Sequence, residues 1–389
     1  MSDNLYSRDA FGGQDIDLFR LSGPRSDQNS NEPQRRRVDF NVSQRAAQST
    51  ASHVNAINRS IDVGFAKDIS ERDLKVAVVV LDSVHAITQY LLTHPLVVIR
   101  RQTQVSLGSK VYHLTPFTVI ALVVGIQSRQ GFGVLWKGIA SVFLTKAIQI
   151  GLESIISEMT PFVRDFSSKK MSVESVTQHL LLKGVAIVLV TPFLCSSCAE
   201  TVQSSIASEN PGILDSIWEG FRRLTHWKIS DRKLPIWHLC GPTLSYHLSY
   251  YLISSCVQKV SLYVKNSDKT TRTENNNKLF DKYKEIMSSF WGQLVADVML
   301  FPLQTILMRL YLQGTRTIID NVSKPSAVTP IISNYESTTD CFATIVKDEG
   351  RLGLMKGFGA LVLQYSIHYS LLRLTKYCLN KTISGLQND

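Results

Sequence analysis

The side chains that could do chemistry in this chain lie in apolar segments. Cys195 and Cys198 form a C-x-x-C pair, a spacing shared by zinc ligands and redox dithiols. No second pair follows at a metal-ligand spacing, and the pair lies just after Pro192 in an apolar run, so close packing of small side chains is the alternative interpretation. The sequence has no recognisable Ser-His-Asp arrangement, glycine-rich phosphate loop or metal-ligand cluster. We therefore predict no enzymatic activity, no metal and no cofactor.

A longer pattern of proline, arginine, lysine and glycine occurs twice. The first copy runs from His94 to Gly138 and the second from Phe301 to Gly357. Each has a proline, an arginine five to seven residues later and an amphipathic stretch. Each then has a glycine, four further residues, a bulky apolar residue, Lys and Gly. A pattern of this complexity indicates an internal repeat.

The composition describes a basic chain of 389 residues with a formal net charge of +10. This charge favours an anionic neighbour, and lipid headgroups fit better than nucleic acid because the basic residues are scattered and no base-stacking motif appears. Six cysteines without a regular framework favour a reducing environment. The first twenty residues contain four aspartates and no apolar core, so we expect neither a matrix presequence nor a secretory signal, and membrane targeting should be internal.

Six apolar segments follow a polar N-terminus, and each approaches or exceeds the ~20 residues that span a bilayer core. Only Leu234 to Gln258 is a long charge-free run of the kind that a simple hydropathy scan would select. Residues 111–128 would also attract such a scan, but their place in the repeat favours a connecting amphipathic helix. The segments cover roughly residues 75–101, 138–158, 174–206, 234–264, 284–313 and 357–381.

The spacing of the apolar segments and of three prolines predicts the domain organisation. Pro95, Pro192 and Pro302 lie near the ends of the first, third and fifth segments. We predict an all-α membrane protein with six transmembrane helices in three tandem two-helix repeats, after a disordered tail. The boundaries are 1–73 for the tail, 74–165 for repeat 1, 166–265 for the degenerate repeat 2, 266–283 for a polar linker and 284–389 for repeat 3.

This organisation resembles the mitochondrial carrier family, solute carrier family 25, over residues 75 to 383. More specific motifs are similar to its divergent, member 46-like outer-membrane branch: YHLTPFTVI (112–120), ISEMTP (156–161), HLLLK (179–183), ETVQS (200–204), QGTRTIIDN (313–321) and KGFGA (356–360). The resemblance implies the carrier fold and a multi-pass protein of the mitochondrial outer membrane that acts in fission, fusion and cristae organisation. The partners it implies are mitofusins, the inner-membrane dynamin-like fusion GTPase and the cristae-junction complex.

The carrier family closes one end of its cavity with a ring of ion pairs between the acids and bases of its proline motif. In this chain the acid positions hold Val97, Leu194 and Gln304, and the base positions hold Arg100, Ser197 and Leu307. Five of the six gate charges are missing, so Arg100 has no ring partner. Because an ion pair stabilises a site only when both charges are present, we predict that this ring is not built.

Two further sets of residues are candidates by their place in the repeat. Lys137, Gly138, Lys356 and Gly357 begin the second and sixth apolar segments, where backbone N–H groups and a lysine suit an anionic lipid phosphate. The alternative is a helix start with an interfacial aromatic. Gln149, Tyr250 and His368 fall at the level of the carrier cavity, where they could bind a solute or form hydrogen bonds between helices.

Four charged residues within the apolar segments should point inward and find partners, because a charge facing lipid is costly: Asp82, Lys146, Lys183 and Asp297. The interpretation that follows is a carrier-like adaptor of the outer membrane without conventional solute transport. The alternative is a genuine solute or lipid transporter with a modified gate. We expect both termini in the cytosol and the connections within each repeat, including residues 313–321, in the intermembrane space.

Overall fold

The computed structural model describes residues 71–107, 109, 111–162, 173–204, 215–225, 234–267, 277–315, 317–322 and 328–386. The predicted disordered tail of residues 1–73 lies outside the described residues except for its last three, which begin the first helix. Of the predicted linker 266–283, the described residues are 266–267 and 277–283, which belong to helices.

The first group of helices begins with α2 (Glu71–Ile87), which continues through a π-helical turn, η1 (Thr88–Leu92), into α3 (His94–Val105). Pro95 lies in the first turn of α3, where the missing N–H of proline costs no hydrogen bond. The short helix α4 (Pro116–Gln130) and the 3-10 turn η2 (Phe132–Trp136) then lead to α5 (Ile139–Met159). The 15 residues of α4 extend about 22 Å, too short to cross a bilayer core of about 30 Å.

The other two groups follow the same order of long, short and long helix. In the second group, α6 (Val173–Val202) contains Pro192, α7 (Asp215–Thr225) is the short helix and α8 (Ile236–Ser267) is the second long helix. In the third group, α9 (Asn277–Met299) and α10 (Phe301–Leu312) meet at a bend of 67° beside Pro302. The short helix α11 (Thr338–Glu349), the turn η4 (Arg351–Met355) and α12 (Phe358–Leu386) complete it.

A small antiparallel hairpin departs from the predicted all-α fold. Strand β1 (Ile318–Asp320) pairs with β2 (Val328–Pro330) between α10 and α11. Ile319 also forms an isolated bridge with Gln203 at the end of α6, and Ile318 O accepts a hydrogen bond from Ser204 N. The hairpin therefore joins the third group to the second.

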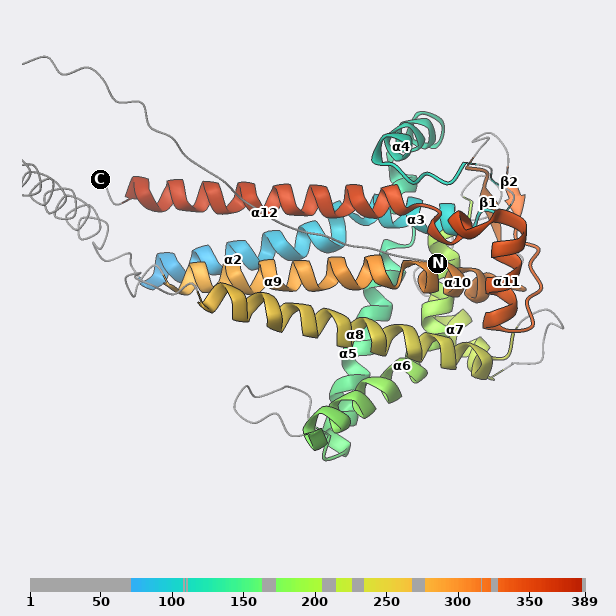
Figure 1. Cartoon of the computed structure of the whole chain (residues 1–389), viewed down its shortest axis with the longest axis horizontal. Coiled ribbons are helices and arrows are strands. Elements are labelled where there is room, and N and C mark those ends of the chain that lie inside the picture. The colour runs from blue at the N-terminus through green and yellow to red at the C-terminus, as the bar shows by residue number, and fades with distance from the viewer. Residues whose placement is uncertain are drawn as a thin grey trace, which may run out of the picture. The chain divides into compact units, whose positions relative to one another are not determined.

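The long helices pack as a series of neighbours: α5 on α6, α6 on α8, α8 on α9, α9 on α2 and α2 on α12. Figure 1 shows α2, α8, α9 and α12 side by side, while α5 and α6 diverge from them. At one end of the set formed by α2, α8, α9 and α12, α3 and α10 pack against each other and against α6. We call this meeting place of α3, α10 and residues 192–202 of α6 the junction.

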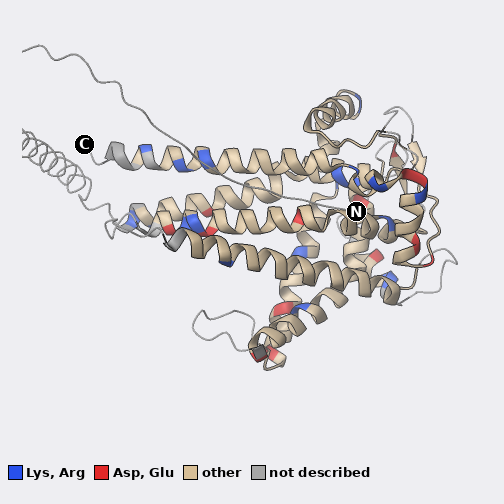
Figure 2. Ribbon diagram, viewed as in Figure 1, with Lys and Arg blue, Asp and Glu red and all other residues tan. Residues whose placement is uncertain are grey.

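Three helical segments are long and apolar enough to cross a membrane: Leu74–Val105, Phe132–Met159 and Glu174–Val202. The bent pair α9 and α10 is a fourth if it counts as one span. The expectation that only Leu234–Gln258 would satisfy a hydropathy scan is wrong. This run has no charged residue, but it is rich in Ser, Tyr and His, which lower its mean hydropathy. The three segments that satisfy the scan contain a few charges and more aliphatic side chains. Figure 2 shows most charged residues of α8 and α12 toward the helix ends.

Candidate functional site

The nine residues of the degenerate gate motif lie where the sequence places them, at the start of α3, in α6 and at the start of α10. In the described part of the chain, none of the six residues at the acid and base positions makes an ion pair. Arg100 is only 6 % exposed, and its Nε and Nη1 atoms have no hydrogen-bond partner. The junction therefore contains a buried guanidinium where a carrier gate would have three ion pairs.

Neutral contacts take the place of those ion pairs. Ser197 Oγ accepts a hydrogen bond from Ser141 of α5 at 3.3 Å. Gln304 Oε1 accepts one from Gln104 Nε2 of α3, also at 3.3 Å. Leu307, at a base position, is buried to 1 % exposure.

An apolar cluster fills the junction around Leu307, and we call it the apolar plug. It draws on α3, α6, α8, α10, β1, α11 and η4, so it connects all three groups of helices. Its members include Val105, Cys195, Cys198, Val202, Tyr246, Ile306, Leu307, Met308, Leu310, Tyr311, Ile319 and Leu354. A continuous buried cluster of this kind makes the junction part of the protein core.

The C-x-x-C pair belongs to the apolar plug. Cys195 and Cys198 are free and fully buried, and Cys198 Sγ lies 3.2 Å from Met308 Sδ. Among the residues that the structure describes, no three His, Cys, Asp or Glu side chains are close enough to hold a metal ion. The geometry therefore favours close packing of the two cysteines over a zinc or redox site.

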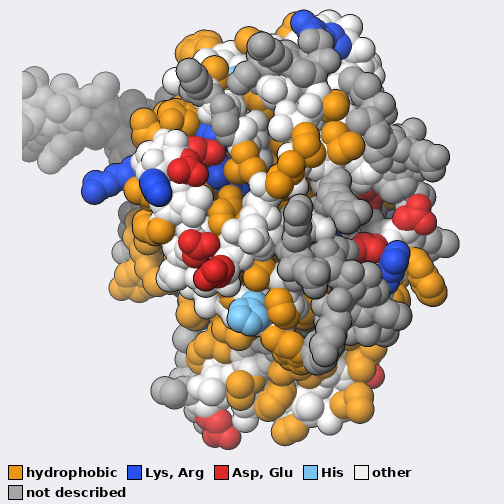
Figure 3. All heavy atoms as spheres, turned by 90° about the vertical axis from the view of Figure 1, so that its right-hand side faces the viewer, with side chains coloured by type: hydrophobic (Ala, Val, Ile, Leu, Met, Phe, Trp, Pro, Cys, Tyr) orange, Lys and Arg blue, Asp and Glu red, His pale blue; other side chains and the backbone are white. Residues whose placement is uncertain are grey.

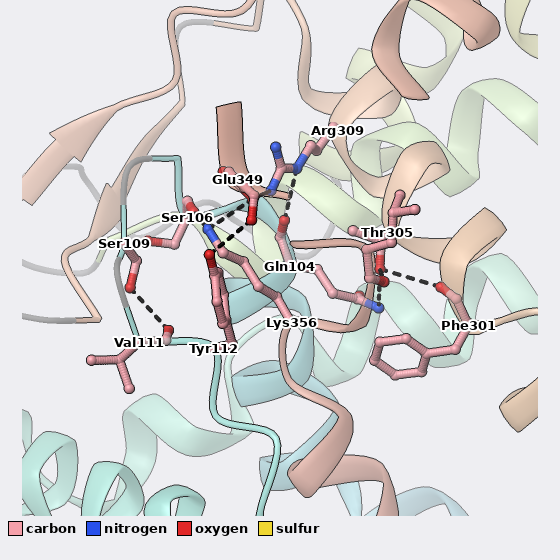
Figure 4. Close-up of polar contacts among 11 residues, drawn as sticks. Gln104, Ser106, Ser109, Val111, Tyr112, Phe301, Thr305, Arg309, Glu349 and Lys356 are labelled. Atoms are coloured by element: carbon pink, nitrogen blue, oxygen red, sulfur yellow. Dashed lines mark hydrogen bonds and ion pairs between the residues drawn. The ribbon is translucent and has the colours of Figure 1, made fainter. Parts of the chain in front are cut away.

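A buried ionic network lies beside the plug and is centred on Glu349 (Figure 4). Glu349 Oε2 accepts from Arg309 Nη2 at 2.7 Å and from Lys356 Nζ at 2.9 Å. Lys356 also donates to Ser106 O at 3.0 Å, and Arg309 Nε donates to Gln104 O at 3.0 Å. All three charged side chains are at most 8 % exposed, so the network ties α10, α11 and the start of α12 to the end of α3.

A second network, centred on Asp320 of β1, mirrors the first. Lys137 Nζ donates to Gln203 O at 2.8 Å and lies 3.4 Å from Asp320 Oδ2, while Ser204 Oγ donates to Asp320 Oδ1. Both predicted lysines thus bond a main-chain carbonyl at the end of the first long helix of another group. Each also meets a carboxylate supplied by the third group.

Close backbone packing accompanies these lysines. A Cβ added to Gly138 would overlap Thr201 of α6, and one added to Gly357 would overlap Thr103 of α3. Two N–H groups at the start of α12 are already paired, because Gly357 N donates to Tyr112 O and Gly359 N donates to His113 O. The lipid role of Lys137, Gly138, Lys356 and Gly357 stays a prediction, and the structure gives both lysines internal partners.

The three cavity candidates lie in separate contact networks. Gln149 accepts from Lys146 Nζ at 3.1 Å and donates to Glu153 at 3.0 Å. The ring of Tyr250 is tilted by 36° against that of Tyr246, with ring centroids 6.2 Å apart. His368 is buried against His85, with 3.1 Å between ring nitrogens. Of these contacts, only the one between His85 and His368 joins two helices, because those of Gln149 and Tyr250 stay within α5 and α8. Solute binding and the hydrogen-bond alternative both stay predictions.

The four charged residues of the apolar segments each have a polar partner. Lys183 Nζ lies 2.7 Å from Glu153, and Asp297 accepts from Tyr365 Oη. Asp82 lies 3.5 Å from Lys282 Nζ, and Lys146 donates to Gln149. Lys146 is nevertheless exposed and the Asp82 side chain is 47 % exposed, so the predicted inward orientation does not hold for these two.

Sequence reasoning missed Glu349 and Asp320 as the acceptors at the centre of both networks. A signal was present for Glu349, because it precedes the glycine that opens the Gly-x4 part of the repeated motif, where the first copy has Gln130. No comparable signal marks Asp320, since its hairpin has no counterpart in the first copy.

Burial shifts the pKa of several titratable groups outside the helices that could span a membrane. Desolvation lowers the pKa of Lys356, and the ion pair with Glu349 opposes this shift. Burial raises the pKa of the Tyr335 phenol, with the nearby Arg309 guanidinium acting in the opposite direction. Burial raises the pKa of the Cys341 thiol to about 12, so this cysteine stays a neutral thiol at physiological pH.

Comparison with known proteins places this architecture in a family. The model of the mitochondrial carrier protein family matches residues 279–385. The mitochondrial outer membrane protein SLC25A46 of Gallus gallus is 45 % identical over 297 residues, which cover 74 % of this chain and 72 % of that protein. The Danio rerio protein of the same name is 42 % identical over 301 residues, covering 74 % of each chain.

The Homo sapiens relative, also named mitochondrial outer membrane protein SLC25A46, is 41 % identical over 297 residues, covering 74 % of this chain and 71 % of that protein. Relatives at this identity and coverage bear out the resemblance seen in the sequence motifs and agree with the apolar helices of the structure. The chain therefore belongs to the mitochondrial carrier family, solute carrier family 25, in the SLC25A46 group of mitochondrial outer membrane proteins.

Proposed function

We propose that this protein is an adaptor of the mitochondrial outer membrane that regulates fission, fusion and cristae organisation without conventional solute transport. The proposal includes six membrane crossings in three repeats, at residues 74–165, 166–265 and 284–389. The termini would be cytosolic and α4, α7 and α11 would lie toward the intermembrane space. The repeated order of long, short and long helix supports this arrangement.

The observation that carries the proposal is the apolar plug. A carrier gate that opens in each transport cycle exchanges ion pairs for contacts with water, so its opening costs little net free energy. Opening the junction here would expose side chains such as Leu307, Leu310 and Tyr311, which are at most 3 % exposed. A fully buried aliphatic or aromatic side chain of this size contributes about 1.5–3 kcal/mol, so the plug opposes the opening that alternating access requires.

The face at the junction end supports a docking role. Figure 3 shows hydrophobic side chains spread over this face among isolated acidic and basic side chains. Short elements at this end expose large apolar side chains, including Phe117 at 82 % and Trp218 at 73 %. The family resemblance gives mitofusins, the inner-membrane dynamin-like GTPase and the cristae-junction complex as the partners to test, with anionic phospholipid as a further ligand.

The test combines reconstitution with crosslinking. In proteoliposomes, the purified protein should move no labelled solute from a panel of common carrier substrates above the rate of empty vesicles. In mitochondria, photo-crosslinkers placed at the exposed Phe117 and Trp218 should capture the proposed fusion, fission or cristae proteins. Saturable solute uptake, together with no capture of these proteins, would overturn the adaptor proposal.

The transporter alternative rests on the polar cluster of Lys146, Gln149, Glu153 and Lys183 between α5 and α6. Two lysines and one glutamate leave a net positive charge at mid-span, which would suit an anionic solute. Uptake that is lost in Gln149→Ala would favour this alternative. Uptake that persists in this variant would argue against a solute site at this cluster.

A further inference from the structure

Arg100 differs from the other two arginines of the junction in having no hydrogen-bond partner for two of its nitrogens. Arg309 bonds Glu349 and Gln104 O, and Arg101 Nη1 donates to Thr201 Oγ1 at 3.1 Å. Arg100 is 6 % exposed, with Nε and Nη1 both buried and unpaired. Arginine cannot lose its proton in a protein, and a buried, unpaired charge is strongly destabilising. Nε and Nη1 therefore need an acceptor that the described side chains do not provide.

Ionisable groups of three other helices lie close enough to interact electrostatically with Arg100. Its charge acts on Tyr246 and Tyr250 of α8, on Asp297 of α9 and on Tyr365 of α12. Asp297 is the carboxylate among them, and it is held by the Tyr365 hydroxyl at 2.5 Å. No ion pair within 4.0 Å joins Asp297 to Arg100 in the described structure.

We propose that Arg100 binds one singly charged anionic group, a carboxylate or a phosphodiester, between α3, α8 and α9. The planar guanidinium offers two parallel N–H donors that match two oxygens of such a group. The Tyr246 hydroxyl of α8, which lies within electrostatic range of Arg100, would be a further donor to the anion. The charge of Asp297 disfavours a second negative charge nearby, so a singly charged ligand fits better than a doubly charged one.

This chemistry has two possible sources, a small soluble anion and the headgroup of a phospholipid. Either would hold α3 against α8 and α9 and so stabilise the closed junction. The inference does not depend on the adaptor function, because a transporter with the same Arg100 would have the same need for an anion.

The experiment measures the thermal stability of the full-length protein in detergent with and without added anion. The soluble probes are acetate, which carries one charge, and sulfate, which carries two, at equal ionic strength against chloride. Native mass spectrometry of the same samples counts phospholipids that stay bound. The test variant is Arg100→Gln, and the matched control is Arg101→Gln, which removes a neighbouring arginine that already has a partner.

Two results would support the proposal. In the first, acetate raises the Tm of the wild type and the control more than sulfate does, and Arg100→Gln weakens the acetate response at least about tenfold in concentration, as loss of a charge-assisted contact predicts. In the second, soluble anions have no effect, while one phospholipid with a phosphodiester headgroup stays bound to the wild type and the control and is absent from Arg100→Gln.

Two results would overturn it. If Arg100→Gln is as stable as the wild type and leaves anion response and lipid count unchanged, no anion is held there. The second result is a loss of stability in Arg100→Gln with no change in anion response or bound lipid. If Asp297→Asn loses the same stability, and the double variant loses no more than either single variant, Arg100 is paired with Asp297 inside the chain. If Arg100→Gln does not fold, Arg100→Lys, which keeps the charge, takes its place as the test variant.

Discussion

At the scale of single residues, Glu349 is a buried carboxylate that pairs with two buried cations. One carboxylate oxygen meets both Arg309 and Lys356, and these three side chains are almost excluded from solvent. Removing one partner from such a group leaves the remaining charges buried and uncompensated, which costs more than the pairing contributes. Glu349 is therefore a structural residue on which two cations depend.

We predict that Glu349→Gln destabilises the protein by about 3–5 kcal/mol, because two buried cations lose their counter-charge. Equilibrium unfolding in mixed micelles measures the change. Glu336→Gln is the matched control, since Glu336 is exposed between β2 and α11 and its replacement should change stability by less than about 0.5 kcal/mol. Equal effects of the two variants would contradict the role given to the network.

Gly357 sets the distance between α12 and α3 and has a positive φ of +83°. Gly350 has a similar φ of +75° but open space where a Cβ would lie. Both positions become strained on substitution by alanine, and only Gly357→Ala also collides with Thr103. We predict that Gly357→Ala costs about 1–3 kcal/mol more than Gly350→Ala, the usual range for overpacking.

Thermal unfolding of the two glycine variants measures this difference. Adding Thr103→Ala to Gly357→Ala should recover part of the loss, because the Thr103 hydroxyl is the atom that the new Cβ meets first. A Gly350→Ala variant that is as unstable as Gly357→Ala would show that backbone strain, and not the close approach of the helices, decides the outcome.

The sequence predicted much at the residue scale where a motif constrained the position. It identified the gate residues and their missing charges, because each has a fixed offset from a proline. It did not predict that Lys356 is 1 % exposed, since a lysine at a helix start has the same local pattern whether it faces lipid or an internal carboxylate. The burial of Lys356 depends on its ion pair with Glu349, which lies on a different element.

At the scale of elements, the plug is the feature on which the closed junction depends. Leu307 stands at a former base position, is 1 % exposed and packs within a cluster drawn from seven elements. We predict that Leu307→Ala lowers stability by about 2–5 kcal/mol through lost burial and the cavity it leaves.

Leu352→Ala is the control for Leu307→Ala, because Leu352 is 54 % exposed in η4 and its loss should change stability by less than about 0.5 kcal/mol. Unfolding in mixed micelles compares the two variants. If Leu307→Ala unfolds at the same denaturant concentration as the control, the plug contributes little and the argument against an opening junction is lost.

The sequence predicted the helices better than it predicted the links between them. Apolar runs and prolines predicted the ends of the long helices to within about seven residues, the largest difference being at the start of α9. The hairpin of β1 and β2 was missed because each strand has only three residues, too short for an alternating pattern to be recognised. Its position depends on pairing with Ser204 and Gln203, which lie more than a hundred residues earlier.

At the scale of the whole protein, the proposed orientation puts both termini in the cytosol and the short helices toward the intermembrane space. With both termini cytosolic, a polyethylene-glycol maleimide too large for outer-membrane pores should label Lys381→Cys in intact mitochondria and Glu336→Cys only after rupture of the outer membrane. Both positions are exposed, and the exposed native Cys256 and Cys378 are first replaced by serine. Labelling of Glu336→Cys in intact mitochondria and of Lys381→Cys only after rupture would show the inverted orientation. Labelling of both positions in intact mitochondria would exclude the proposed orientation.

The two lysine-to-carbonyl bonds described above connect the groups of helices in a definite order. Lys137 joins the first group to the second, Lys356 joins the third to the first, and the hairpin strand β1 supplies the remaining link from the third to the second through Ser204. This last connection has two hydrogen bonds to one serine in place of a buried lysine. On mild heating, deuterium uptake should therefore rise in the last turn of α6 before it rises in the last turn of α3, while the packing of α8 on α9 still holds the second and third groups together.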